Sequence, residues 1–103
     1  MKHRVVFSNA AEKDLLDLLI YLVPQAGERI ARAYVDRLID YCSDFDTFPE
    51  RGTRHDDIKP GLRTVGYRRR ATIAFTIKDK TVTILRVFNG GRHVILDDED
   101  DAS

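Results

Sequence analysis

Apolar residues recur along this chain with two different spacings, and the change of spacing separates a helical part from a β-rich part. A short β-branched run, residues 3–7, comes first and predicts a strand. Apolar residues then return at steps of three and four over residues 11–23, and again over residues 30–48, which is the spacing of one face of an α-helix. We therefore expect one strand followed by two amphipathic helices.

The ends of the first helix are predicted by polar and conformationally restricted residues. Asn9 can cap the helix, and Glu12 three residues later completes a capping-box pattern, so the helix should begin near Ala10. Pro24 disfavours the helical conformation at the residue before it, and Gly27 gives the backbone freedom to reverse. A tight helical hairpin should follow.

The second helix should run from about Glu28 and end by Phe48, because Pro49 disfavours helix at the residue before it. Its large apolar residues are expected to lie in register on one face: Ile30, Tyr34, Leu38, Tyr41, Phe45 and Phe48. Residues 50–61 are polar and bounded by proline and glycine, so they predict a surface loop.

Three strands are predicted after the loop, at residues 62–68, 71–77 and 81–88, with turns at 69–70 and 79–80. In the second of these strands apolar residues alternate with Thr and Ala, as in a sheet with one buried face. The expected fold class is α+β with the order β-α-α-β-β-β, in which a helical hairpin packs on an antiparallel sheet.

Length and cysteine content bound the domain and its compartment. The 103 residues have the length of one domain, which we place at residues 1–96. Cys42 is the only cysteine, so the chain cannot form an intrachain disulfide. A small domain without disulfides is typical of a reducing compartment, and we expect the cytoplasm. No run is apolar enough for a signal peptide or a membrane span, and no grouping of His, Cys, Asp or Glu has metal-ligand spacing. We expect no membrane contact, no metal and no cofactor.

Positive and negative charges are unevenly distributed, although the formal net charge is zero. Five acids lie in residues 97–101. Removing them from the seventeen Asp and Glu leaves twelve against seventeen Lys and Arg, so residues 1–96 have a formal charge of +5. We expect a basic body and an acidic, disordered tail over residues 97–103. The alternative is a tail that screens the basic face until a partner displaces it.

Several short motifs follow one another in a characteristic order and spacing. They are Ser8, Ala11 and Asp14-Leu15; Ala33 and Tyr34; Pro49 and Gly52; Gly61-Leu62-Arg63; Tyr67-Arg68; and Ile84-Leu85-Arg86-Val87-Phe88. Together they resemble the ParE/RelE toxin superfamily over residues 3–93. The resemblance implies the toxin of a type II toxin-antitoxin pair, neutralised by an antitoxin whose C-terminal segment wraps the helices and sheet. It also implies two alternative activities, because ParE-like members poison DNA gyrase by contact and RelE-like members cut messenger RNA in the ribosome.

The nuclease alternative needs groups that move protons and cations that stabilise a charged transition state. Its catalytic candidates here are Arg63, Arg86 and His93, with His93 as the proton-transfer group. RelE-like nucleases usually supply a tyrosine just after the last core strand, whereas residues 89–93 of this chain read Asn-Gly-Gly-Arg-His. The missing tyrosine favours the ParE-like alternative, in which the chain has no catalytic residue.

Arginines and a C-terminal apolar trio are the candidate contact residues for a target or an antitoxin. The set is Arg63, Arg68, Arg69, Arg70, Arg86, Arg92, Val94, Ile95 and Leu96. Arg63 and Arg86 occupy arginine positions that recur in the family, and we expect them on neighbouring strands. They could instead stabilise the sheet by pairing with Asp14 or Glu12, and residues 68–70 could be a solvated turn. His55, beside two aspartates, is expected to be a surface ion-pair partner.

The partners follow from the resemblance. In ParE-like toxins the C-terminal segment is linked to gyrase poisoning, so we expect DNA gyrase as the target and a ParD-like antitoxin in a hetero-oligomer. The alternatives are the ribosome with messenger RNA, for a RelE-like nuclease, or an antitoxin alone, for a non-toxic member that only forms complexes.

Overall fold

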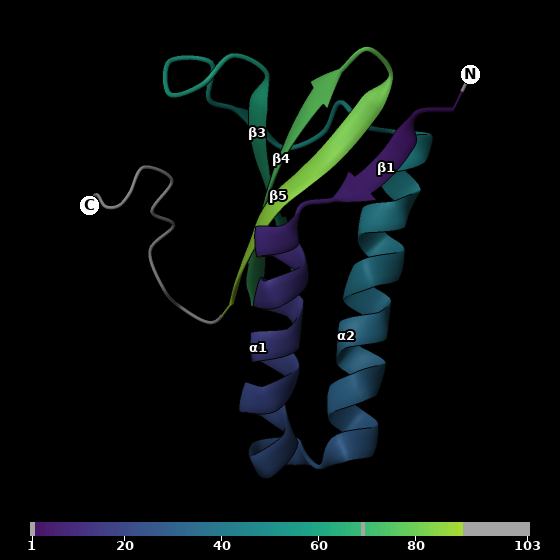
Figure 1. The fold of residues 1–103 in the computed structure, drawn as a ribbon, viewed down its shortest axis with the longest axis vertical. Helices are drawn as coiled ribbons and strands as arrows, with labels where there is room; N and C mark the ends of the chain where they lie inside the picture. Colours follow the sequence, from purple (N-terminus) through teal and green to yellow (C-terminus); the bar gives the residue numbers. More distant parts are fainter. Residues whose placement is uncertain (1, 69, 90–103) are drawn as a thin grey trace.

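The computed structural model describes residues 2–68 and 70–89. Their elements, in chain order, are β1 (Arg4–Phe7), α1 (Asn9–Ala26), α2 (Glu28–Ser43), a 3-10 turn η1 (Asp44–Asp46), β2 (Thr53–Arg54), β3 (Leu62–Tyr67), β4 (Ala71–Lys78) and β5 (Thr81–Asn89). The two helices lie side by side as an antiparallel hairpin (Figure 1). No helix in the described part of the chain is long and apolar enough to cross a membrane.

The strands form one sheet in the order β1-β5-β4-β3-β2. The expected α+β class and the hairpin on a sheet are confirmed, with two corrections. The sheet is mixed rather than antiparallel, because β1 pairs in parallel with β5, from Arg4 opposite Thr81 to Phe7 opposite Ile84. The predicted loop 50–61 also contains β2, which adds a short antiparallel strand to the edge of β3.

Ser8, rather than Asn9, caps α1. Ser8 is extended, with φ −67° and ψ 162°, and its hydroxyl accepts a hydrogen bond from the Ala11 N–H at 3.0 Å. The same hydroxyl donates to the Leu85 carbonyl at 2.8 Å, so the cap also joins α1 to β5. Asn9 is the first residue of the helix, and the predicted cap was therefore one residue too late.

The far ends of both helices differ from the sequence expectation. Although Pro24 was expected to disturb the helix, α1 continues through it to Ala26, and the chain reverses at Gly27, whose φ is +90°. Pro24 has no N–H to donate to the Ile20 carbonyl, so the last turn of α1 lacks one helical hydrogen bond. The second helix stops at Ser43, short of Phe48, since the 3-10 turn η1 tightens the chain after it.

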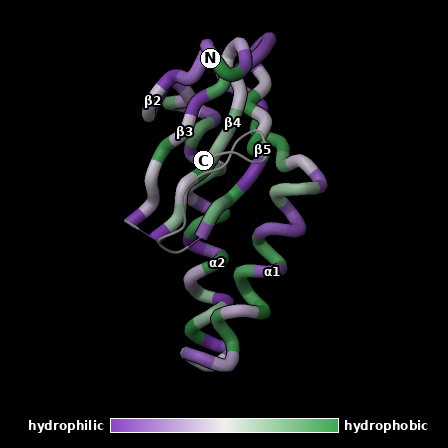
Figure 2. The backbone as a smooth tube through the Cα atoms, turned by 90° about the vertical axis from the view of Figure 1, so that its left-hand side faces the viewer, coloured by the Kyte–Doolittle hydropathy of each residue, from purple (hydrophilic) through white to green (hydrophobic). Residues whose placement is uncertain are grey.

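The core lies between the helical hairpin and one face of the sheet. Its largest fully buried side chains are Phe45, Phe75, Leu38, Ile73, Ile84, Val82 and Cys42. Each contributes roughly 1.5 to 3 kcal/mol by leaving water. Two of the predicted core residues are not buried: Ile30 is 53% exposed and Phe48 is 70% exposed. The turn of the helical hairpin extends beyond the sheet (Figures 1 and 2), and Ile30 is the third residue of α2 after that turn.

Candidate functional site

Arg86, a candidate for the target site or for catalysis, is bound to a carboxylate of α1. Its Nε donates to Asp14 Oδ2 at 2.7 Å and its Nη2 donates to Asp14 Oδ1 at 3.0 Å. Asp14 has only 14% of its side chain exposed, and Arg86 has 48%. The hydrogen bonds to Asp14 raise the pKa of Arg86 above its usual value. The expected alternative, an ion pair of Arg86 with Asp14, is confirmed.

Arg63 is separated from Arg86 by a whole strand. The two were predicted on neighbouring strands, but β4 lies between β3 and β5. Arg63 pairs with Phe75, which is buried in the core under the helices, whereas Arg86 pairs with Ala74, the next residue of β4. Successive residues of a strand point to opposite faces of the sheet. The register therefore places Arg63 and Arg86 on opposite faces.

A β-bulge in β5 causes this reversal. The register shifts between Ala74 and Phe75, which pair with Arg86 and Ile84 and leave Leu85 as the extra residue. The buried positions change phase at the bulge: Val82 and Ile84 before it are in the core, and so is Val87 after it. Counting by two from Ile84 would have put Arg86 on the core side, and the bulge turns it to the other face.

Arg63 is instead part of an arginine and aromatic cluster at the β3 side of the sheet. Its Nη1 donates to the Arg51 carbonyl at 3.4 Å. The Arg51 guanidinium carbon lies 4.5 Å from the ring centre of Phe45 and 5.5 Å from that of Tyr41, which are cation–π distances. These contacts order the 51–63 segment against the end of α2.

The β3-β4 turn presents arginines to solvent. Arg68 has φ +50°, and its guanidinium carbon lies 5.5 Å from the ring centre of Tyr67. Both Arg68 and Arg70 are exposed, and neither forms a salt bridge with another residue of the described ranges 2–68 and 70–89. Within those ranges no acidic side chain pairs with them, so both cations are available to an acidic segment or partner.

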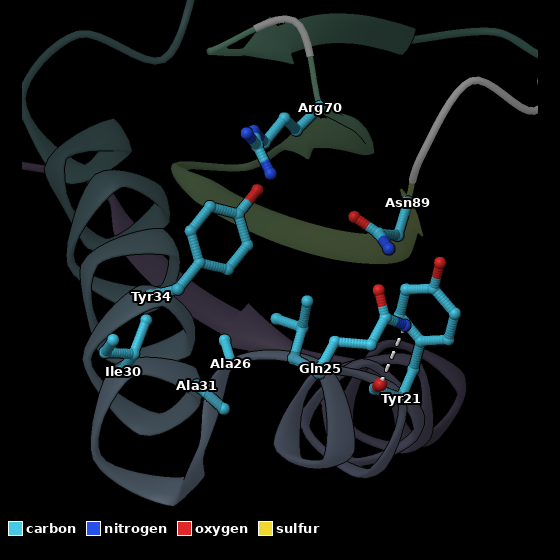
Figure 3. A pocket seen from close by; sticks show the side chains of 9 residues that line it. Tyr21, Gln25, Ala26, Ile30, Ala31, Tyr34, Arg70 and Asn89 are labelled. Atoms are coloured by element: carbon cyan, nitrogen blue, oxygen red, sulfur yellow. Dashed lines mark hydrogen bonds between the residues drawn. The ribbon is translucent and has the colours of Figure 1, made fainter.

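A cavity of about 250 Å³, which we call the junction groove, opens where the helical hairpin meets the end of the sheet. Its lining residues come from both helices, the β3-β4 turn and the end of β5: Tyr21, Leu22, Gln25, Ala26, Ile30, Ala31, Tyr34, Arg70 and Asn89 (Figure 3). Small and aliphatic side chains form its helical wall. Polar ends of Tyr34, Arg70 and Asn89 lie across from that wall (Figure 3).

Tyr34 is the most unusual residue of the junction groove. Its hydroxyl oxygen is buried and has no hydrogen-bond partner among the described residues. Burial, and then the neighbouring Tyr67, raise the pKa of Tyr34, while Arg70 and Arg68 act in the opposite direction. The hydroxyl points toward Arg70 (Figure 3). A buried donor without an acceptor costs roughly 1 to 3 kcal/mol, so a ligand acceptor here would be favoured.

Among residues 2–68 and 70–89, His55 has no ion-pair partner. Its Nε2 lies 2.8 Å from the Thr64 hydroxyl, within hydrogen-bond distance. The neighbouring Asp56 binds Arg54 at 2.7 Å and accepts the Gly61 N–H at 2.9 Å. These two interactions, the backbone one first, lower the pKa of Asp56 below its usual value.

Several sequence-predicted site residues lie outside the described residues: Arg69, Arg92, His93, Val94, Ile95 and Leu96. The tail 97–103 lies outside them as well. Within the described part, no three residues among His, Cys, Asp and Glu are grouped as a metal site. Cys42 is fully buried, and burial raises the pKa of its thiol to about 12.

Sequence reasoning missed the junction groove. Tyr34 was assigned to the core face of the second helix, and Tyr21, Gln25 and Asn89 were assigned no role. The large apolar residues Tyr21 and Ile30 lie on either side of the predicted helical turn, but only the structure shows that they are more than half exposed. Only the end of β5, far away in sequence, completes the groove.

Comparisons with known proteins agree with this architecture. The family model described as "ParE toxin of type II toxin-antitoxin system, parDE" matches residues 5–94. No curated protein sequence matches the chain significantly. Solved structures share the fold, and three illustrate it. The first, from a chromosomal ParDE toxin-antitoxin system of P. aeruginosa, has a TM-score of 0.75 and 21% identity, covering 86% of this chain and 97% of that one.

The other two have lower TM-scores. The RelBE2 toxin-antitoxin complex of Mycobacterium tuberculosis has a TM-score of 0.59 and 23% identity, covering 89% of this chain and 95% of that one. A conserved hypothetical protein of Helicobacter pylori has a TM-score of 0.51 and 13% identity, covering 84% and 93%. The family model covers most of the chain, and the fold agrees with it. The chain therefore belongs to the ParE family of type II toxin-antitoxin toxins.

Proposed function

We propose that this ParE-family toxin acts by binding DNA gyrase, without a catalytic step of its own, and that a ParD-like antitoxin neutralises it. The observation that carries the proposal is the separation of Arg63 and Arg86. A phosphodiester-cleaving site needs its cations around one phosphate. Arginines on opposite faces of a sheet cannot both contact the same phosphate, and Arg86 already shares its charge with Asp14.

Exposed groups of the described chain are suited to protein contact. Arg68 and Arg70 form a small basic patch at one end of the sheet, where they can contact acidic residues of a partner. Such charges raise the association rate more than the final affinity, and they make binding sensitive to salt.

Exposed apolar residues of the helical hairpin support an antitoxin partner. Leu16, Ile20, Tyr21 and Ile30 are each more than half exposed on the two helices. Large apolar residues that stay exposed on so small a domain suit protein-protein contact. An amphipathic segment of an antitoxin could cover them.

The test is expression in a bacterial host with separate readouts of the DNA damage response and of transcript cleavage, followed by a supercoiling assay with purified gyrase. DNA damage without transcript cleavage, and direct inhibition of supercoiling, would support the proposal. Ribosome-dependent cleavage of messenger RNA would assign the RelE-like activity instead. If neither effect is observed, the result would favour a non-toxic member that only forms complexes with an antitoxin.

A further inference from the structure

The junction groove combines an apolar wall with unsatisfied polar groups at one end. Leu22, Ala26 and Ile30 supply apolar surface from the two helices. At the other side, the Tyr34 hydroxyl lacks a hydrogen-bond partner among the described residues, and Arg70 has no salt bridge there. A matching ligand would carry bulky aliphatic groups followed by oxygen acceptors with negative charge.

The chain itself carries such a sequence directly beyond the described fold. Val94, Ile95 and Leu96 are three consecutive bulky aliphatic residues, and five acids follow them at residues 97–101. No other stretch of the chain places an aliphatic trio before an acidic run. Its composition is therefore complementary to the groove both in polarity and in charge.

The segment also starts at the groove. Asn89, the last described residue, is one of the groove's lining residues (Figure 3). Residue 94 is five residues further on, which allows a span of up to roughly 17 Å. Two glycines, Gly90 and Gly91, lie in between and allow backbone conformations that a reversal of the chain requires. The aliphatic trio can thus reach the helical wall.

We propose that residues 94–101 occupy the junction groove of their own molecule, with Val94 to Leu96 on the helical wall and the acids beside Arg70 and Arg68. A short flexible link gives such a segment an effective concentration in the millimolar range, so a weak contact suffices to keep it bound. Docking is reversible, and a target or an antitoxin that uses the segment or the groove must first displace it. This inference does not depend on gyrase being the target.

Hydrogen exchange by mass spectrometry on the purified full chain tests the proposal. The amides of residues 94–96 should exchange at least about tenfold more slowly than in a free peptide of residues 90–103. Ile30→Asp, which puts a charge on the groove wall, should abolish this protection. Ile58→Asp should retain it, because Ile58 is exposed to a similar extent, 51% against 53%, and does not line the groove.

Two further measurements complete the test. Arg70→Glu changes an exposed residue, so it should leave the fold intact and still reduce the protection, which should also fall as salt is added. Protection should not depend on protein concentration. Free-peptide exchange rates in the unmodified chain would overturn the proposal, as would protection that survives both Ile30→Asp and Arg70→Glu. Protection that grows with concentration would assign the groove to a second copy of the chain and overturn it as well.

Discussion

The carboxylate of Asp14 takes the place of a neighbouring strand beside Val87. β1 pairs with β5 only as far as Ile84, and the next part of the β5 edge is covered by α1. Asp14 Oδ2 accepts the Val87 N–H at 2.9 Å in addition to its two hydrogen bonds from Arg86. One side chain therefore satisfies a backbone donor at an otherwise open edge and fixes α1 on the sheet.

We expect Asp14→Asn to lower the free energy of unfolding by about 1 to 3 kcal/mol, because it removes the charge-assisted hydrogen bonds to Arg86. The control is Asp17→Asn, since Asp17 forms an exposed pair with Lys13 on the same helix. Such a surface pair contributes at most about 1 kcal/mol. Urea unfolding followed by circular dichroism measures the free energy of unfolding of both variants. Equal stability of the two variants would show that Asp14 does not fix α1 on the sheet.

Gly52 should be the glycine that least tolerates a side chain. Its φ is +77°, and a Cβ there would clash with the backbone carbonyl oxygen of Thr64. We expect Gly52→Ala to destabilise the fold by about 2 to 5 kcal/mol, from backbone strain together with the clash. Gly27→Ala is the matched control, because Gly27 also has positive φ, +90°, but nothing lies within 4 Å of its Cβ position. Its cost should be smaller, roughly 1 to 3 kcal/mol, from the strain of the backbone at φ +90° and ψ 157° alone.

The thiol of Cys42 should be inert in the folded protein. Burial raises the pKa of the thiol from its ordinary value of 9.0, which applies in the unfolded state, to about 12. The folded state therefore holds the thiol proton more tightly than the unfolded state does. Stability is therefore unaffected well below pH 9 and falls as pH rises from about 9 toward 12. A thiol reagent at pH 8 should label the chain only after denaturation. Rapid labelling of the native protein would contradict this burial.

The type and order of most elements could be predicted from the sequence because their signals are local. Apolar spacing gave both helices, and alternation with turn residues gave the three C-terminal strands. The errors came from long-range contacts. Ser8 was missed as the cap because its second partner, Leu85, is 77 residues away in the sequence. The parallel pairing of β1 likewise depends on how the hairpin packs, which no short window contains.

The candidate site was harder to predict than the fold. The pairing of Arg86 with Asp14 could be anticipated, since a guanidinium and a carboxylate are natural partners. The opposite placement of Arg63 and Arg86 could not, because it depends on the bulge at Leu85, which reverses the alternation within β5. The junction groove requires the helix turn, the β3-β4 turn and the end of β5 to be in place together.

The exposed arginines of the β3-β4 turn should act in binding and not in folding. We expect Arg68→Ala combined with Arg70→Ala to change the free energy of unfolding by less than about 0.5 kcal/mol. Affinity for the antitoxin or the target should fall, and the remaining binding should depend less on salt. A double variant of Arg4 and Lys59, which removes the same charge from exposed positions elsewhere, is the control. Equal affinities of both double variants at low and high salt would exclude the turn from the interface.

The last prediction separates binding from catalysis at the C-terminal segment. If His93 were a general acid or base, His93→Ala would reduce RNA cleavage by roughly two to four orders of magnitude. On the gyrase proposal no proton is transferred, so His93→Ala should keep most of the toxicity. Deletion of residues 94–103 should abolish toxicity, because it removes the segment that is proposed to leave the groove and contact the target. The described fold should survive the deletion, since its core lies within residues 2–89.

Both variants need a folding control before growth is compared. Circular dichroism and thermal unfolding should show a folded protein with cooperative unfolding for the full chain, His93→Ala and the truncated chain, because the described core lies within residues 2–89. Growth after induction then measures toxicity, and gyrase supercoiling measures the proposed mechanism. A folded His93→Ala variant without toxicity, together with a fully toxic truncation, would contradict gyrase binding through this segment. It would assign the activity to proton transfer at His93, as in a messenger RNA nuclease.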